Sequence, residues 1–182
     1  APHKTTDQYY PYEINRNFYY LTGLKRSNFI LIIQKDGKNY FEYLFIEEAT
    51  DYSNKWLGKR MTKTEASSAS GIDEKNIYFI EQFDLFIHQN VLSSQRKAVA
   101  RTPKIIYLDL YRHKPYQIPV SLSKFDQIFK SYPDIAIRNI NEYIDIMRMY
   151  KDSYEIEQIK KAISYSKVGI EAILSVATPG IN

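Results

Sequence analysis

The stretch NFILIIQKDGKNYFEYLFI (28–46) decides the fold, because it predicts a β-hairpin. Two runs rich in Ile, Leu, Phe and Tyr, at 28–35 and 40–46, enclose a short polar segment, and such runs are typical of strands. Asp36 and Gly37 in the polar segment tolerate the positive φ angles of a tight turn. The first run is apolar almost without interruption, which predicts a strand that is buried on both faces.

Strands and helices alternate in the chain beyond this hairpin. Further apolar runs predict strands, and apolar residues at helical spacing predict helices. The expected strands are 76–80, 104–110 and 134–140, and the expected helices are 62–71, 81–95 and 122–132. This alternation favours an α/β fold in which a mixed β-sheet, partly of parallel strands, is flanked by helices.

The helix expected at 62–71 has recognisable signals at both ends. Thr62 is a suitable N-cap, and Glu65 three residues later completes a capping box, in which two side chains satisfy free backbone N–H groups. Gly71 is suited to the left-handed conformation in which many helices end.

The last part of the chain is predicted to be helical as well. Asp152 and Glu155 form a second capping box, at the start of a helix that runs from about 153 to 177 and stops before Pro179. Its Ile and Val residues recur at helical spacing, so its apolar face needs a partner. The helix either packs on the sheet or begins a second domain.

The closeness of the chain end to Pro179 favours the second alternative. We therefore expect one domain at 1–150 and the first helix of another domain at 151–182.

Composition excludes several classes of protein. The 182 residues carry a formal charge of +4, from 25 basic and 21 acidic residues, but the basic clusters are short and separated. A nucleic-acid surface more often shows a continuous basic stripe, so we expect no nucleic-acid partner. The chain contains no cysteine, which excludes disulfides and thiolate metal sites and fits a reducing cytoplasm. It contains no apolar run of transmembrane length, so we expect a cytoplasmic protein with no membrane partner.

The side chains predict no catalytic residue and no metal site within the chain. His3, His88 and His113 are far apart, and none belongs to the i, i+4 pair of a helical zinc site. His88 is expected to be partly buried or on the surface. Asp73 and Asp84 have a spacing that some dinuclear metal hydrolases use, but we expect a turn at Asp73 and the first turn of a helix at Asp84. No nucleophile elbow, Walker loop or dinucleotide fingerprint is present.

The stretch KWLGKR (55–60) contains the only tryptophan of the chain, Trp56. A lone indole is usually a core residue, but this one lies in a charged segment without core periodicity. Composition and periodicity leave its role open.

Three segments resemble the creatinase/prolidase-type N-terminal domain of Xaa-Pro aminopeptidases, also called aminopeptidase P. They are YYPYEINRNFYYLTGL (9–24), LFIEEATDYSNKWLGKR (44–60) and IMRMYKDSYEIEQIKKA (146–162). The likeness covers most of the chain in the right order. It implies a ribonuclease H-like, mixed α/β domain, which ends in a long helix that begins a catalytic domain of the pita-bread type.

The resemblance also implies that the chain is a fragment that lacks its first helix and strand. In the family, the catalytic domain holds two metal ions, usually manganese, on two Asp, one His and two Glu, all of which would follow Asn182. The parent protein would release an N-terminal residue that precedes proline, and it would be a homodimer or tetramer. The fragment alone would hold no cofactor and would be inactive.

The family's N-terminal domain builds the oligomer and contributes residues to the mouth of an active site. Carried over by motif, Trp56 resembles a wall of the substrate pocket, Arg148 a residue beside the entrance, and Asp7 a further substrate contact. We expect Trp56 on a loop, with Gly58 allowing a turn and Arg60 anchoring it. These are substrate-binding roles, so no catalytic residue is expected in the chain.

One departure from the family pattern and two alternatives stay open. Glu13 stands where many relatives carry a basic residue, and Arg16 is the nearby candidate to replace it. The parent could be a prolidase that acts on dipeptides, or a non-catalytic module of the same fold that binds peptides or proteins. The Trp-Leu-Gly-Lys-Arg stretch at 56–60 favours the aminopeptidase. The residues beyond Asn182 discriminate between an enzyme and a binding module.

Overall fold

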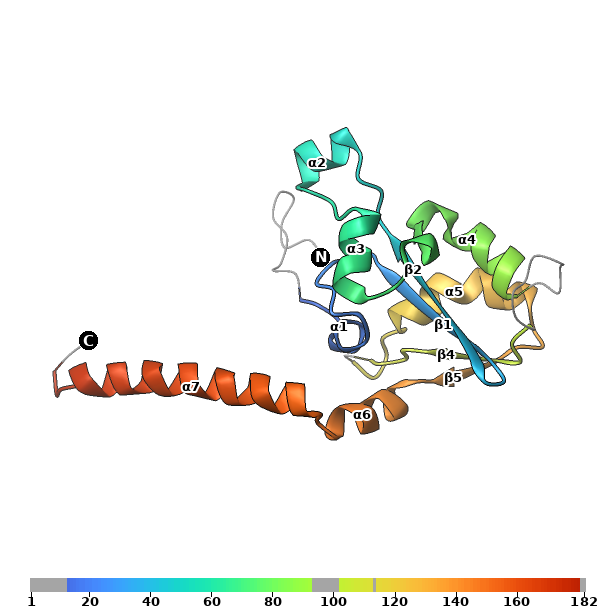
Figure 1. Ribbon diagram of the computed structural model, residues 1–182. Helices are drawn as coiled ribbons and strands as arrows, with labels where there is room; N and C mark the ends of the chain where they lie inside the picture. Colours follow the sequence, from blue (N-terminus) through green and yellow to red (C-terminus); the bar gives the residue numbers. More distant parts are fainter. Residues whose placement is uncertain (1–12, 93–101, 113, 181–182) are drawn as a thin grey trace. The chain divides into compact units, whose positions relative to one another are not determined.

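The computed structural model describes residues 13–92, 102–112 and 114–180, and the chain divides into two compact units (Figure 1). The first unit comprises Ala1–Ile106 and Phe125–Ile137, and the second comprises Tyr107–Lys124 and Arg138–Asn182. Across the described residues, no helix combines the length and the apolar character that a membrane span requires.

The hairpin predicted from the opening stretch is present in the first unit. Strand β1 (Ile30–Asp36) pairs antiparallel with β2 (Asn39–Ile46), so that Ile30 lies opposite Phe45. Strand β3 (Ile77–Phe79) then pairs parallel with β2, and the strand order in this sheet is β1-β2-β3. The central position of β2 fixes which part of the hairpin is buried.

The prediction that the first strand of the hairpin is buried on both faces is wrong. Ile33 in β1 is 52% exposed, whereas Leu44, Phe45 and Ile46 in β2 are fully buried. The reason is the strand order: β1 is an edge strand of the described sheet, while β2 has a neighbour on each side. The apolar residues of an edge strand gain cover only where a helix or loop lies over them.

One face of the sheet is covered by helices α1 (Arg16–Thr22) and α3 (Lys63–Ser70). Leu44 and Ile46 pack there in one buried cluster with Ala66 of α3. Helix α3 confirms its prediction: the Thr62 side chain and Glu65 form the capping box. The helix ends at Gly71, whose φ of +77° is the left-handed conformation that glycine adopts without strain.

Helix α1 was not predicted, although it carries ordinary capping signals. The Asn15 side chain accepts a hydrogen bond from the Phe18 backbone N–H at 2.9 Å, which satisfies a free donor of the first turn. Phe18 packs against the buried cluster of this face. The helix has only seven residues, and its run of aromatic residues shows no clear helical period.

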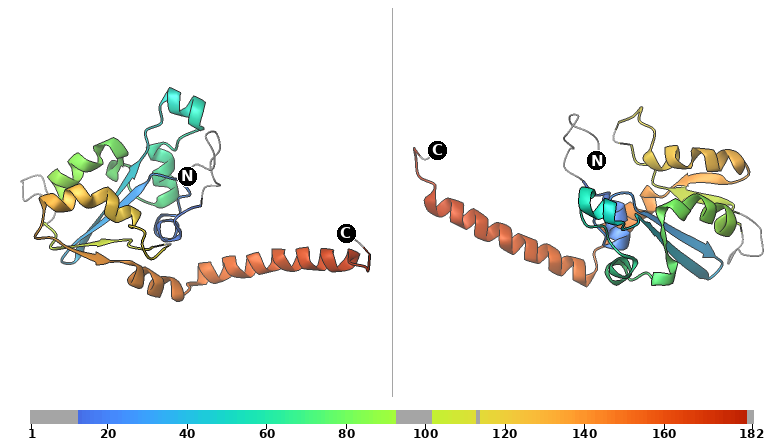
Figure 2. Two further views of the ribbon diagram at one scale, coloured as in Figure 1. Left: turned by 180° about the vertical axis from the view of Figure 1, so that it is seen from behind. Right: turned by 90° about the horizontal axis from the view of Figure 1, so that it is seen from above.

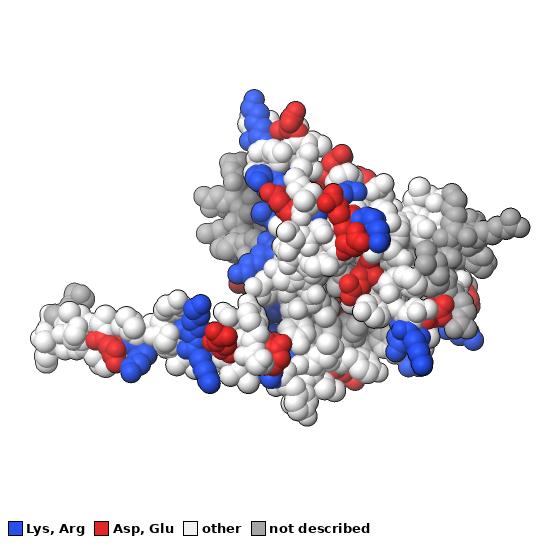
Figure 3. All heavy atoms as spheres, in the orientation of Figure 1, with Lys and Arg blue, Asp and Glu red and all other residues white. Residues whose placement is uncertain are grey.

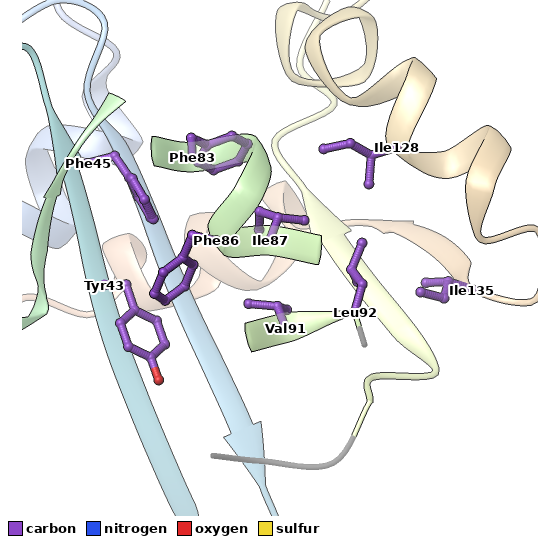
Figure 4. Packing of buried hydrophobic residues seen from close by; sticks show 9 residues of the cluster. All are labelled: Tyr43, Phe45, Phe83, Phe86, Ile87, Val91, Leu92, Ile128 and Ile135. Atoms are coloured by element: carbon purple, nitrogen blue, oxygen red, sulfur yellow. The ribbon is translucent and has the colours of Figure 1, made fainter. Parts of the chain in front are cut away.

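The other face of the sheet carries the larger core (Figure 4). Its nine buried residues come from β2, from the segment 83–92, and from the segment that carries α5: Tyr43, Phe45, Phe83, Phe86, Ile87, Val91, Leu92, Ile128 and Ile135. The ring of Phe45 meets Phe83 and Phe86 edge-to-face, at centroid distances of 5.0 and 5.3 Å. Such aromatic pairs add about 0.5–1.5 kcal/mol each to the free energy of area burial.

The helix expected at 81–95 forms with three successive kinds of turn within the described residues. The 3₁₀ turn η2 (Ile80–Gln82) leads into α4 (Phe83–Phe86), and a π-helical turn, η3 (Ile87–Val91), follows. The expected apolar face is nevertheless the buried one, apart from Asn90, which is half-buried and donates from Nδ2 to the Phe86 carbonyl at 3.2 Å. The spacing of the apolar residues therefore predicted where the helical segment lies, but it did not predict the 3₁₀ and π-helical turns.

The remaining predicted elements are present close to their expected positions. Strands β4 (Ile105–Leu108) and β5 (Ala136–Asn139) form a two-stranded sheet, and α5 (Val120–Ser131) lies between them in the chain. The Ala136 N–H donates to the Lys104 carbonyl, and the Ile140 N–H donates to the Leu108 carbonyl, both at 3.0 Å. From the first of these bonds to the second, the donor and the acceptor move by the same number of residues in the same chain direction. This is the pattern of a parallel strand pair.

The second unit ends in two helices, α6 (Asn141–Met149) and α7 (Ser153–Val176). Asp152 and Glu155 form the predicted capping box, and both views of Figure 2 show α7 as one unbroken helix. No residue of α7 is buried in the described structure; Ile163, for example, is 61% exposed. Figure 3 shows charged side chains spaced along α7 with uncharged atoms between them. The predicted mixed α/β fold with flanking helices and a long C-terminal helix is thus confirmed.

Candidate functional site

Trp56 lies in helix α2 (Asp51–Leu57), and the expectation of a loop at this position is wrong. The helix starts with the hydrogen bond from the Asn54 N–H to the Thr50 carbonyl, at 2.9 Å. The Asp51 carboxylate lies in the first turn, where a negative charge interacts favourably with the helix dipole. Gly58 follows with a φ of +86°, a conformation that stops the helix and that L-residues rarely adopt. The charged composition of the segment concealed these helix signals.

The indole of Trp56 is presented to solvent. It is 68% exposed, and Tyr52, one turn earlier on α2, is 73% exposed. Residues four apart share one side of a helix, so α2 displays two aromatic rings together. The Lys55 ammonium lies 5.8 Å from the centre of the Trp56 ring, near the outer limit of a cation–π contact. Trp56 therefore takes no part in either buried cluster.

A set of polar contacts holds the chain that follows α2. Arg60 forms an ion pair with Glu47, just after β2, and both side chains are largely shielded from solvent. Glu47 also accepts a hydrogen bond from Asn28 Nδ2 at 2.9 Å. The Arg60 backbone N–H donates to Asn54 Oδ1 at 2.8 Å, which ties the segment back to α2. These contacts agree with the expected anchoring role of Arg60.

Lys59 links the same segment to helix α3. Its Nζ lies 2.7 Å from Glu65 Oε1, and Glu65 also accepts the Thr62 backbone N–H at 2.9 Å through the capping box. The hydrogen bond from Lys59, followed by that from Thr62, lowers the pKa of Glu65 to about 2. The carboxylate is therefore ionised in the folded state throughout the neutral and mildly acidic range.

Arg148 and Asp7 are the other two candidate residues. Arg148 lies in the last turn of α6 in the second unit, where a cation interacts favourably with the helix dipole, and its side chain is half-buried. Its backbone carbonyl accepts a hydrogen bond from Lys151 Nζ. Asp7 lies outside the described residues. Glu13 and Arg16, which bear on the departure from the family pattern, are both exposed near the start of α1.

The described residues offer no donor set for a metal ion. No group of three or more His, Cys, Asp or Glu side chains converges anywhere in 13–92, 102–112 or 114–180. Asp73 caps the 3₁₀ turn η1 (Glu74–Asn76), and the bond from Lys75, whose Nζ lies at 2.8 Å, lowers the pKa of its carboxyl. His88 is half-buried, with Nδ1 at 3.0 Å from the Tyr132 hydroxyl oxygen. We therefore assign no metal chemistry to these residues.

A polar cavity of about 220 Å³ lies beside the anchoring contacts and was missed from the sequence. We call it the basic cavity, and it is lined by Lys25, Arg26, Ser27, Phe29, Glu47, Lys59, Arg60 and Met61. Its cations come from two Lys-Arg pairs, at 25–26 and 59–60. The repeated pair is the one sequence signal that could have pointed to it, but only folding brings the pairs together.

Comparisons with known proteins come from sequence and from structure. Residues 1–99 match the family model of the aminopeptidase P N-terminal domain. A protein of Fusarium vanettenii that is named as a Xaa-Pro aminopeptidase is 27% identical over 177 residues, which covers 97% of this chain and 33% of that protein. Intermediate cleaving peptidase 55 of Schizosaccharomyces pombe is 26% identical, over 87% of this chain and 31% of its own length. The chain thus spans about a third of the length of these curated relatives.

Two solved structures share the fold over nearly the whole chain. An aminopeptidase P from Bacillus anthracis superposes with a TM-score of 0.77 at 32% identity, covering 93% of this chain and 39% of that protein. Proline aminopeptidase P II from Yersinia pestis superposes with a TM-score of 0.69 at 21% identity, covering all of this chain and 41% of the other. At 21% identity, the second likeness shows the fold alone.

Proposed function

The chain belongs to the aminopeptidase P N-terminal domain family, and from this premise we propose that it forms the N-terminal domain of a Xaa-Pro aminopeptidase. The proposed enzyme releases an N-terminal residue that precedes proline. The match to the Fusarium vanettenii relative over 97% of this chain supports the proposal. The chain covers 33% of that relative. We therefore propose that the catalytic residues of the enzyme lie in the region that corresponds to the uncovered part of the relative.

We propose that the N-terminal domain extends over 1–150 and that 151–182 contribute the first helix of the catalytic domain. The capped helix α7, which begins at Ser153 and buries no residue within the described structure, supports this division. The two metal ions, proposed to be manganese, belong to the catalytic domain, since the described residues offer no converging ligands. Assembly into a dimer or tetramer is part of the same proposal.

The specific task that we propose for this domain is to shape the entrance of a substrate pocket for Xaa-Pro peptides. The observation that carries it is the exposure of Trp56: a 68% exposed indole at the end of a short helix contributes little to the core. The contacts of Arg60 with Glu47 and Asn54 hold the segment beside it. An indole held in this way offers a flat apolar wall for a proline ring. Arg148 and Asp7 are proposed as further substrate contacts.

The decisive experiment replaces Trp56 by alanine in the longer protein that the proposal implies. We expect kcat/KM for a Xaa-Pro peptide to fall at least about tenfold, the loss expected when an aromatic anchor of a binding site is removed. We expect the free energy of unfolding to change by less than about 0.5 kcal/mol, because the ring is exposed. Steady-state kinetics and urea denaturation measure the two quantities.

Tyr40→Ala is the matched control, because Tyr40 is an equally exposed aromatic residue beside the hairpin turn, at the end of β2 opposite to the one that leads into α2. This variant is expected to retain kcat/KM within about twofold, as for a surface substitution away from the pocket. If Trp56→Ala destabilises the protein but leaves the activity of folded molecules unchanged, then Trp56 is structural and the entrance role is wrong.

A further inference from the structure

We propose that the basic cavity binds a small anion that carries a phosphate group. Four cationic side chains, Lys25, Arg26, Lys59 and Arg60, line this cavity of about 220 Å³, and Glu47 is the one carboxylate among the lining residues. An excess of positive charge in a concave surface concentrates anions, because the protein walls reduce solvent screening. This proposal is independent of the peptidase function and concerns the first unit alone.

The walls of the cavity are fixed by contacts with Glu47. One carboxylate oxygen of Glu47 accepts a hydrogen bond from Asn28 Nδ2 at 2.9 Å, and the other is paired with Arg60. Both oxygens are therefore occupied, and the segments 25–29 and 59–61 are held around the same space. Asn28 has a φ of +57°, a left-handed conformation that Asn tolerates better than most residues. The cavity is thus a built feature of two loops.

Arg60 retains an unused donor at this place. Its Nε–H is buried, and no atom of the described structure accepts a hydrogen bond from it. A buried N–H group without an acceptor is destabilising relative to a satisfied one. Arg60 lines the cavity, so an anion there would lie beside its guanidinium charge, whereas a cationic or apolar ligand would gain nothing from that charge.

The lining favours a phosphate over a carboxylate and limits the size of the ligand. Two of the four cations are arginines, whose planar guanidinium groups match the geometry of phosphate oxygens. The volume of about 220 Å³ is smaller than the roughly 300 Å³ at which pockets for drug-sized ligands begin. Phe29 and Met61 add an apolar wall. The ligand is therefore free phosphate or a small phosphate monoester.

The test is calorimetric titration of the 182-residue chain with inorganic phosphate and, separately, with phenyl phosphate, at an ionic strength held constant with KCl. We expect saturable binding at one site. Tighter binding of phenyl phosphate identifies a monoester, and equal or weaker binding identifies free phosphate. Higher KCl weakens the affinity, because salt screens the exposed cations. The absence of saturable binding of either probe overturns the proposal.

Two lysine variants locate the binding. Lys59 pairs with Glu65 at 2.7 Å and lines the cavity, whereas Lys130 pairs with Asp126 at 2.6 Å on α5 and does not. We expect Lys59→Gln to weaken phosphate binding about three- to fivefold, as for the loss of one solvent-exposed charge interaction, and Lys130→Gln to leave it unchanged. Equal weakening by both variants shows non-specific attraction and overturns the proposal.

Two further measurements make the result independent of one variant. Lys25→Gln removes the cation that lies 5.2 Å from the Tyr19 ring centre, on the other lining segment, and it is expected to weaken binding as Lys59→Gln does. Trp56 is the only tryptophan of the chain, and Arg60 is hydrogen-bonded to Asn54 in the same helix. The fluorescence emission of Trp56 is therefore expected to change as phosphate is added, with the same midpoint concentration as the calorimetric signal.

Discussion

Strand β2 and helix α7 are both rich in apolar residues, yet they end in opposite environments. Residues 43–46 of β2 are all buried, between two clusters on the two faces of the sheet. The isoleucines of α7 are all exposed in the described structure. An apolar sequence therefore favours burial, but the neighbouring elements determine whether its side chains are buried. Exposed apolar faces of this kind are typical of interaction surfaces.

The largest test of this comparison removes one apolar side chain from each element. Phe45→Ala deletes a fully buried ring that contacts Phe83, Phe86 and Tyr78, so we expect a loss of about 3–5 kcal/mol in the free energy of unfolding. Ile163→Ala deletes a side chain that is 61% exposed, and we expect a change within about 0.5 kcal/mol. Urea denaturation followed by far-UV circular dichroism measures both.

The same pair of variants can break the comparison. If Ile163→Ala is as costly as Phe45→Ala, then α7 is covered in solution, most simply by a second copy of the chain. In that case the unfolding midpoint rises with protein concentration, because association stabilises the folded state by mass action. A midpoint that is independent of concentration, together with a small effect of Ile163→Ala, leaves the helix uncovered.

The sequence predicted the elements of the fold well because the signals that define them are local. The hairpin around Asp36 and Gly37, and the capping boxes at Thr62 and Asp152, depend on residues within a few positions of each other. The edge position of β1 could not be predicted in this way, since strand order depends on segments far apart in the chain. The apolar run at 28–35 predicted a strand, but it did not predict which strands lie beside it in the sheet.

The candidate site was predictable to a smaller extent, for the same reason. The motif identified Trp56, but the charges around it concealed the short helix α2. The basic cavity was missed because Lys25 and Arg26 meet Lys59 and Arg60 only after the hairpin has formed between them. Single residues and their neighbours can be found in a sequence, whereas a cavity is a property of the assembled chain.

A pair of capping variants gives the next largest expected effect and sharpens the comparison between packed and unpacked elements. Thr62 caps α3, which contributes the buried Ala66 to the core, and Asp152 caps α7, which buries no residue in the described structure. We expect Thr62→Ala to lower the global free energy of unfolding by about 1 kcal/mol. We expect Asp152→Ala to leave it unchanged, because α7 is not coupled to a core.

The loss of the Asp152 cap should instead be visible locally. Amide hydrogen exchange in the first turn of α7 is expected to become faster, since fraying of a helix end without tertiary contacts is opposed only by its cap. If Asp152→Ala lowers the global stability as much as Thr62→Ala does, then α7 unfolds together with a packed unit, and the distinction drawn between the two regions fails.

The smallest expected effect concerns surface charge on α3, within the packed unit. Glu65 has its pKa lowered from 4.5 to about 2, chiefly by the hydrogen bond from Lys59. Because the folded-state pKa lies below the ordinary value, the stabilisation is present above about pH 4.5 and is lost as the pH falls towards 2. The carboxylate is exposed, so the change in overall stability is expected to be slight, although the titration itself is measurable.

Carboxyl-detected NMR titration of the 182-residue chain measures this pKa directly. Lys59→Gln is expected to raise the pKa of Glu65 towards 4.5, while the bond from the Thr62 N–H keeps part of the shift. Lys130→Gln, which removes a comparable exposed ion pair on α5, is expected to leave Glu65 unchanged. A pKa of Glu65 that does not respond to Lys59→Gln would mean that the capping box alone holds the carboxylate. Lys59 would then be less firmly placed beside the basic cavity than the ion pair indicates.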